Sequence, residues 1–119
     1  MQFLLMCAFD DERWAALAEE HRARIMHDYD LWVREQVTGG RYVTGGKLTG
    51  STTAATIRER DGKPLVVDGP FAEAREQIGG YHVVECRDRD EAVAMAQTIP
   101  TLPAGGTVEV RPVLKSLGS

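Results

Sequence analysis

The segment that most constrains the fold is an apolar stretch at the start of the chain. Residues 2–9 read QFLLMCAF, so neither of the two alternating sets of side chains in an extended segment is polar. A strand of this composition is typical of the middle of a sheet with both faces covered. Both faces of this strand are therefore expected to be covered.

The next segment predicts a long amphipathic helix over roughly 11–38. Asp10 or Asp11 is suited to capping its start, and Gly39 with Gly40 is suited to ending it. A break near 18–20 is expected. The stripe at helical spacing consists of Trp14, Leu17, Ala18, Ile25, Tyr29, Trp32 and Gln36.

The middle of the chain has the pattern of short strands and tight turns. Residues 41–48 are extended apart from Gly45 and Gly46, which indicate a bulge or a close backbone approach. Asp61-Gly62 between residues 53–60 and 63–68 predicts a two-residue hairpin. One helical turn is expected over 72–77, followed by a strand over 78–86.

The last third of the chain predicts one more helix and one more strand. Asp88 and Glu91 form a capping pair for a helix that we expect to run to Ile99, before two prolines stop it. The final strand is expected over 107–114. Its inward face would carry Val108, Val110 and Leu114.

This order of elements predicts an α+β protein with a single domain over 1–119. The expected architecture is a ferredoxin-like sandwich, in which two helices cover one face of an antiparallel sheet. That arrangement leaves the second apolar face of residues 2–9 uncovered. A second copy of the chain is the simplest cover, so we expect a homodimer.

Composition and charge exclude several classes of partner. The 119 residues carry 14 basic and 18 acidic side chains, a formal net charge of -4, and the arginines form no basic stripe that would suit nucleic acid. Cys7 and Cys86 lack metal-knuckle or disulfide spacing and are interpreted as small buried hydrophobes. No stretch is long enough to span a membrane. Residues 3–9 superficially resemble a signal segment, but they have no basic n-region, their apolar core is too short and three acidic residues follow at once, so we expect a cytoplasmic protein without a membrane partner.

A rare tetrapeptide, Asp-Gly-Pro-Phe at 68–71, leads into a charged stretch and then Gly79-Gly80-Tyr81. This pattern resembles the YCII-related family in its DGPF subgroup, and the resemblance extends over most of the chain. It implies a dimeric α/β barrel, in which two ferredoxin-like sheets face each other with their helices outside.

The resemblance also implies where chemistry takes place in this family. Relatives pair a histidine of the first helix with an aspartate near the end of the second, and a few carry out dehalogenation or similar reactions of small molecules. The position of the family histidine falls near Tyr29 or Asp30, where this chain has no histidine. The position of the family aspartate falls at 99–100, where this chain has no acidic residue.

Four residues are therefore candidates for acid–base chemistry on other grounds. His21 shares the apolar stripe of the first helix with Asp28 seven residues on, and an imidazole oriented by a carboxylate suits a general base. Tyr29 lies on the same stripe. His82 and Tyr81 point to opposite faces of their strand, and whichever faces away from the helices is expected to line a cavity.

Asp68, the acid that opens the tetrapeptide, is the fourth candidate. It either accepts backbone hydrogen bonds within its turn or presents a carboxylate to a cavity at a strand end. The histidines have structural alternatives as well: a backbone hydrogen bond for His21 and a cross-strand polar contact for His82. No cofactor motif is present, and no local spacing supplies the three convergent ligands that a metal requires.

Two functions remain open from the residues alone. The first is a small-molecule enzyme that uses acid–base residues in a cleft. The alternative is a non-catalytic module that binds a metabolite or a regulatory protein; the family resemblance implies sigma factors as one possible class of partner. Because the chain lacks a basic stripe, such a role would operate through protein contacts.

Overall fold

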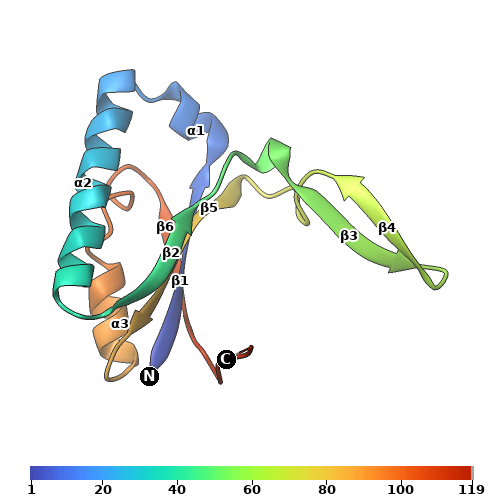
Figure 1. Cartoon of the computed structure of the whole chain (residues 1–119). Coiled ribbons are helices and arrows are strands. Elements are labelled where there is room, and N and C mark those ends of the chain that lie inside the picture. The colour runs from blue at the N-terminus through green and yellow to red at the C-terminus, as the bar shows by residue number, and fades with distance from the viewer. Residues whose placement is uncertain (119) are drawn as a thin grey trace.

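The structure, a computed structural model, describes residues 1–118 and has a ferredoxin-like body with a projecting hairpin (Figure 1). The elements are β1 (Gln2–Asp10), α1 (Asp11–Ala16), α2 (Glu19–Thr38), β2 (Tyr42–Lys47), η1 (Ser51–Thr53), β3 (Ala55–Arg60), β4 (Lys63–Asp68), β5 (Glu76–Glu85), α3 (Arg89–Ala96) and β6 (Thr107–Pro112). The predicted α+β class and ferredoxin-like order are confirmed.

The body is a four-stranded antiparallel sheet in the order β2-β5-β1-β6. Its core lies between the sheet and helices α2 and α3, where Phe3 and Leu5 of β1 meet Trp32 of α2 and Ile99. The alternate residues of β1, Leu4, Met6 and Ala8, lie on the opposite face and are partly exposed. No helix covers that open face in Figure 1.

The predicted helix break is present and leaves two helices. Asp10 caps α1 by accepting hydrogen bonds from the backbone N–H groups of Glu12 and Arg13 at 2.9 and 3.3 Å. The chain leaves helical geometry at Leu17 and Ala18. The Arg22 guanidinium then donates to the carbonyls of Trp14, Ala15 and Leu17, at 3.3, 2.9 and 3.0 Å, and so fixes the corner between α1 and α2.

Three local expectations are wrong. Residues 72–75 form no helical turn, and β5 already begins at Glu76, since Gln77 instead donates through its amide to the carbonyls of Ala72 and Ala74. Helix α3 ends at Ala96 rather than Ile99. The last strand ends at Pro112, which leaves Leu114 outside the sheet and almost fully exposed.

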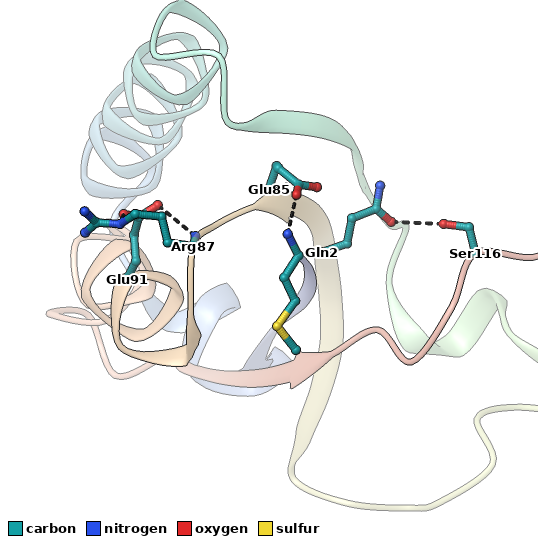
Figure 2. Close-up of polar contacts among 6 residues, drawn as sticks. Gln2, Glu85, Arg87, Glu91 and Ser116 are labelled. Carbon is teal, nitrogen blue, oxygen red and sulfur yellow. Dashed lines mark hydrogen bonds and ion pairs between the residues drawn. The ribbon is translucent and has the colours of Figure 1, made fainter.

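The ends of the chain are fastened to one edge of the body. The N-terminal ammonium pairs with Glu85, and Ser116 donates to the side-chain oxygen of Gln2 at 3.4 Å (Figure 2). The same view shows Arg87 paired with Glu91 at 2.7 Å, beside the N-terminus of α3. These contacts lie away from the cavity described below and have a structural role.

Candidate functional site

The main cavity lies on the helix side of the sheet and has a volume of about 710 Å³. Strands β1, β2 and β5 form its floor, and α1 and α2 form its walls. Phe9, Trp14, Met26 and Val33 supply apolar wall, while Gly46, Gly79 and Gly80 leave the backbone bare. Because Trp14 belongs to α1, the Arg22 contacts at the helix corner also position one side of the cavity.

His82 lies at the polar end of this cavity and is only 3 % exposed. Its partner across β1 is Leu5, so the imidazole is on the face that packs against the helices. The expectation that the residue facing away from the helices lines the cavity is therefore wrong. Tyr81 has that orientation, whereas the cavity is on the other side of the sheet.

Two tyrosines contact the two nitrogens of the His82 ring. The Tyr29 hydroxyl lies against Nε2, and the Tyr42 hydroxyl is 2.7 Å from Nδ1. The Cys7 thiol is 3.2 Å from the same Tyr29 oxygen. The result is a continuous hydrogen-bonded chain from Tyr42 through His82 and Tyr29 to Cys7, and all four residues line the cavity.

Glycine at position 45 makes room for this chain of groups. A Cβ atom there would lie 1.9 Å from the Tyr42 hydroxyl oxygen and 2.8 Å from Nδ1 of His82. The register of β2 against β5 also shifts between Tyr42 and Thr44, which returns Tyr42 to the helix side. The close approach and bulge expected at Gly45 and Gly46 are thus both present.

Burial keeps all four hydrogen-bonded side chains in their neutral forms. Desolvation lowers the pKa of His82 from 6.5 to about 4. Desolvation also raises the pKa of Cys7, Tyr29 and Tyr42, with the Cys7 contact adding to the effect at Tyr29. Near neutral pH the site therefore holds a neutral imidazole between two neutral phenols, with a thiol at one end.

Charged groups are confined to the outer part of the cavity. Lys47, Asp11 and Asp30 line it there, and the Asp11 carboxylate accepts a hydrogen bond from Ser51 at 2.6 Å. Thr101 contributes a buried hydroxyl that has no hydrogen-bond partner within residues 1–118. Within the same described range, no group of three or more His, Cys, Asp or Glu side chains is placed to hold a metal ion.

Of the four residues singled out from the sequence, the structure brings two together. Tyr29 and His82 are in direct contact. His21 lies in the first turn of α2, eight residues before Tyr29 and so about 12 Å along the helix. Asp68 is the exposed last residue of β4, and its carboxylate accepts no hydrogen bond from any residue in 1–118.

Tyr42 and Cys7 were not identified as site residues from the sequence. Tyr42 is the first residue of β2, separated from the end of α2 by three residues, and the bulge in β2 determines which face its side chain takes. Cys7 was interpreted as a buried hydrophobe, and it is buried, but its sulfur also ends the chain of hydrogen bonds. The close-packed Gly45 was the one local signal that a crowded site lies beside this strand.

The fold and the cavity together define a ferredoxin-like α+β protein with a polar-ended pocket between sheet and helices. The YCII-related domain model matches residues 1–116, so the chain belongs to the YCII-related family. It is 34% identical over 114 residues to an uncharacterised protein of Rhizobium meliloti strain 1021, a match that covers 95% of this chain and 92% of that protein.

A solved structure has the same fold. It is the 5-chloro-2-hydroxyhydroquinone dehydrochlorinase of Burkholderia phenoliruptrix AC1100, in complex with 2,5-dihydroxybenzoquinone. The TM-score is 0.58 at 14% identity, over 98% of this chain and 96% of that one. Separately, no helix within residues 1–118 is both long and apolar enough to cross a membrane.

Proposed function

We propose that this protein is a small-molecule enzyme that moves protons on a ligand bound in the 710 Å³ cavity. The observation that carries the proposal is the hydrogen-bonded chain Tyr42–His82–Tyr29–Cys7 along the cavity wall. The acid–base roles fall to Tyr29 and His82. His21 and Asp68 receive no role, because neither lines the cavity.

The electrostatics favour one kind of proton transfer. A histidine whose pKa is about 4 does not take up a second proton at neutral pH, and phenols with raised pKa values do not lose their proton. A neutral imidazole can, however, accept a proton at one nitrogen while it releases one from the other. The chain can therefore exchange protons with a ligand at two points without any buried charge.

This property suits a tautomerisation. One atom of the ligand gives a proton to the chain and another atom receives one, so the ligand and the four side chains remain neutral in total. A ligand with adjacent carbonyl and hydroxyl groups on a flat ring meets the need for an apolar body and two polar edges. The cavity volume lies within the usual range for small-molecule sites, about 300–1,000 Å³.

A direct test uses 2,5-dihydroxybenzoquinone, the ligand of the dehydrochlorinase complex, as the probe. Its ring C–H groups exchange with solvent deuterium by way of the keto tautomer, and NMR follows this exchange. The protein is expected to accelerate it. His82→Gln keeps a neutral hydrogen-bonding side chain but cannot swap tautomers, so the acceleration should fall by about 10²–10⁴-fold while binding persists.

A pair of variants tests whether the reaction takes place in this cavity. A Cβ at Gly80 would lie 3.8 Å from the Tyr29 hydroxyl oxygen, so Gly80→Ala narrows the polar end without a clash. The control is Val37→Ala, at an exposed position of α2 that does not line the cavity. Equal exchange rates in the two variants, or full activity in His82→Gln, would overturn the proposal.

The alternative is a non-catalytic module that uses the same cavity to bind a metabolite. The specific observation in its favour is the neutrality of the site, since a fixed set of neutral donors and acceptors also suits recognition without turnover. Saturable binding of the quinone without any exchange would favour this function. A regulatory protein partner such as a sigma factor belongs to this alternative and rests on family resemblance alone.

The proposed enzyme is a homodimer in the cytoplasm. Support for the dimer comes from the open sheet face, where Leu4, Met6 and Ala8 have no helix over them (Figure 1). Support for the compartment comes from the two free cysteines, since thiols persist in the reducing cytoplasm. Light scattering is the simplest check of the dimer, because one copy has a mass of 13.1 kDa.

A further inference from the structure

The β3–β4 hairpin stands apart from the rest of the molecule. Figure 1 shows it projecting from the end of β2 and β5, on the side of the sheet opposite α2 and α3. The radius of gyration is 16.0 Å, and the longest dimension is 48 Å. A compact chain of this length would have a radius of gyration of about 13.5 Å. The hairpin accounts for the difference.

Within residues 1–118 of a single copy, no other element buries this hairpin. Every residue of β4 is exposed, although its sequence is largely apolar. Ile57 and Val66 pair across the strands and are 69% and 62% exposed. Leu65 and Val67 are exposed on the opposite face. Because a two-stranded hairpin alone in water is at best marginally stable, this one needs a partner surface.

We propose that the hairpin is an arm that packs against the body of a second copy of this chain. The inference rests on the dimer proposed above and adds the element that holds it together. The arm and the open sheet face lie on the same side of the molecule, so two copies that join their open faces each point an arm at the other (Figure 1).

The length of the arm fits this arrangement. Strands of six residues span about 20 Å, whereas stacked sheets lie about 10 Å apart. An arm directed across the interface is therefore longer than the gap between the two sheets. Ile57 and Val66 pair halfway along the hairpin, so they lie about level with the partner's sheet and beside the partner's body.

The exposed area is also sufficient. Roughly 100–200 Å² for each full apolar side chain gives the hairpin and Phe71 about 400 Å² of exposed apolar surface. Interfaces are about 57% apolar, so this corresponds to roughly 700 Å² for each copy, close to the 800 Å² of a standard interface. The open sheet face adds to that area.

Charge favours a second copy over other partners. Register places Arg58, Arg60 and Lys63 on one face of the hairpin. Residues 55–68 hold three basic and three acidic side chains, so the net charge of -4 belongs to the rest of the chain, and the body of a second copy is acidic overall. By the same register, Glu59 lies on the other face with Ile57 and Val66, and three cations that share their face with Leu65 and Val67 are too short a run to match a phosphate backbone.

The test measures the dimer dissociation constant by light scattering and sedimentation over a dilution series. The Ile57→Lys/Val66→Lys double variant places two charges in the proposed contact and is expected to weaken the dimer by at least about 100-fold. The matched control is Leu31→Lys/Val37→Lys, at two exposed apolar positions of α2 outside the contact, and it should leave the constant unchanged. Replacement of residues 55–68 by two glycines removes the arm without adding charge and should also give a monomer.

The outcomes separate the arm from the proposals on which it rests. A wild-type protein that stays monomeric at 100 μM or so would overturn both the dimer and the arm. A dimer whose dissociation constant is unchanged in both hairpin variants would overturn the arm and leave the dimer intact. Deuterium exchange in the quinone is measured separately, because all four residues of the hydrogen-bonded chain in the cavity come from one copy. Its result therefore does not depend on the arm.

Discussion

The body and the hairpin of this protein use similar residues in opposite ways. In the body, Leu5 and Val84 are fully buried, and even the polar His82 has a partner for each ring nitrogen. In the hairpin, Ile57 and Val66 have comparable side chains and remain in solvent. The contrast indicates that the helix side of the body is complete within one copy, whereas the hairpin is not.

The largest effect is expected when one aliphatic side chain is truncated in each region and the free energies of unfolding are compared. Leu5→Ala leaves a cavity under the helices and should lower the free energy of unfolding by about 3 kcal/mol. Ile57→Ala removes a side chain that is 69% exposed and should cost about 0.5 kcal/mol or less in the monomer. Denaturant unfolding at concentrations where scattering detects only a 13.1 kDa species measures both.

Equal losses in the two variants would contradict the comparison, because they would mean that the hairpin packs within one copy. Repeating the experiment at high protein concentration sharpens it. There the arm is expected to be covered by the second copy, so the cost of Ile57→Ala should rise towards that of Leu5→Ala.

The buried histidine makes the stability of the body depend on pH. Unfolded His82 takes up a proton below about pH 6.5, but folded His82 does so only near pH 4. Between these values the unfolded state binds more protons, so the contribution of His82 is fully present above pH 6.5 and is lost as the pH falls towards 4. Lowering the pH from 7 to 5 should therefore reduce the free energy of unfolding by about 2 kcal/mol through this group.

Unfolding of the wild type and of His82→Gln at both pH values isolates that contribution. The two proteins differ only at residue 82, so the difference between the two pH dependences belongs to His82. Identical pH dependences would show that the His82 imidazole is not desolvated in the folded protein. The proposed transfer of protons through neutral, hydrogen-bonded side chains in the cavity would then lose its basis.

How far the sequence predicted these features depends on the range of the interactions involved. Two local signals were reliable: Asp61-Gly62 predicted the hairpin, and the helical spacing of Ile25, Trp32 and Gln36 predicted the buried stripe of α2. The exact ends of α3 and of the last strand were predicted less well. The apolar pattern of residues 2–9 predicted a central strand, and β1 lies between β5 and β6.

The site depended on interactions that spacing does not reveal. Tyr29 and His82 are 53 residues apart, and the register of β5 against β1 decides that His82 faces the helices. Tyr42 joins them only because β2 is bulged. His21 satisfied the helical pattern equally well, but the cavity is built around a later turn of α2. One residue of slip in either strand would have reversed these faces.

The smallest expected effect concerns the turn of the hairpin and asks whether the two regions unfold separately. Gly62 has a φ of 76°, and Asp61 before it has a φ of 53°. An alanine in this left-handed region costs about 1 kcal/mol, so Gly62→Ala should speed amide hydrogen exchange in β3 and β4 about fivefold. Gly50→Ala is the matched control, because Gly50 has a φ of −57° and an added Cβ there meets nothing within 4 Å.

If the hairpin opens on its own, exchange in β1 and β5 and the global free energy of unfolding should both remain at their wild-type values in Gly62→Ala. A global loss of the full 1 kcal/mol or so would instead mean that the hairpin and the body unfold as one cooperative unit. The concentration of protein is a further variable, because an arm covered by a second copy exchanges more slowly in the dimer. Slower exchange at high concentration that is confined to β3, β4 and the open sheet face would connect the local instability of the hairpin to its proposed role as an arm.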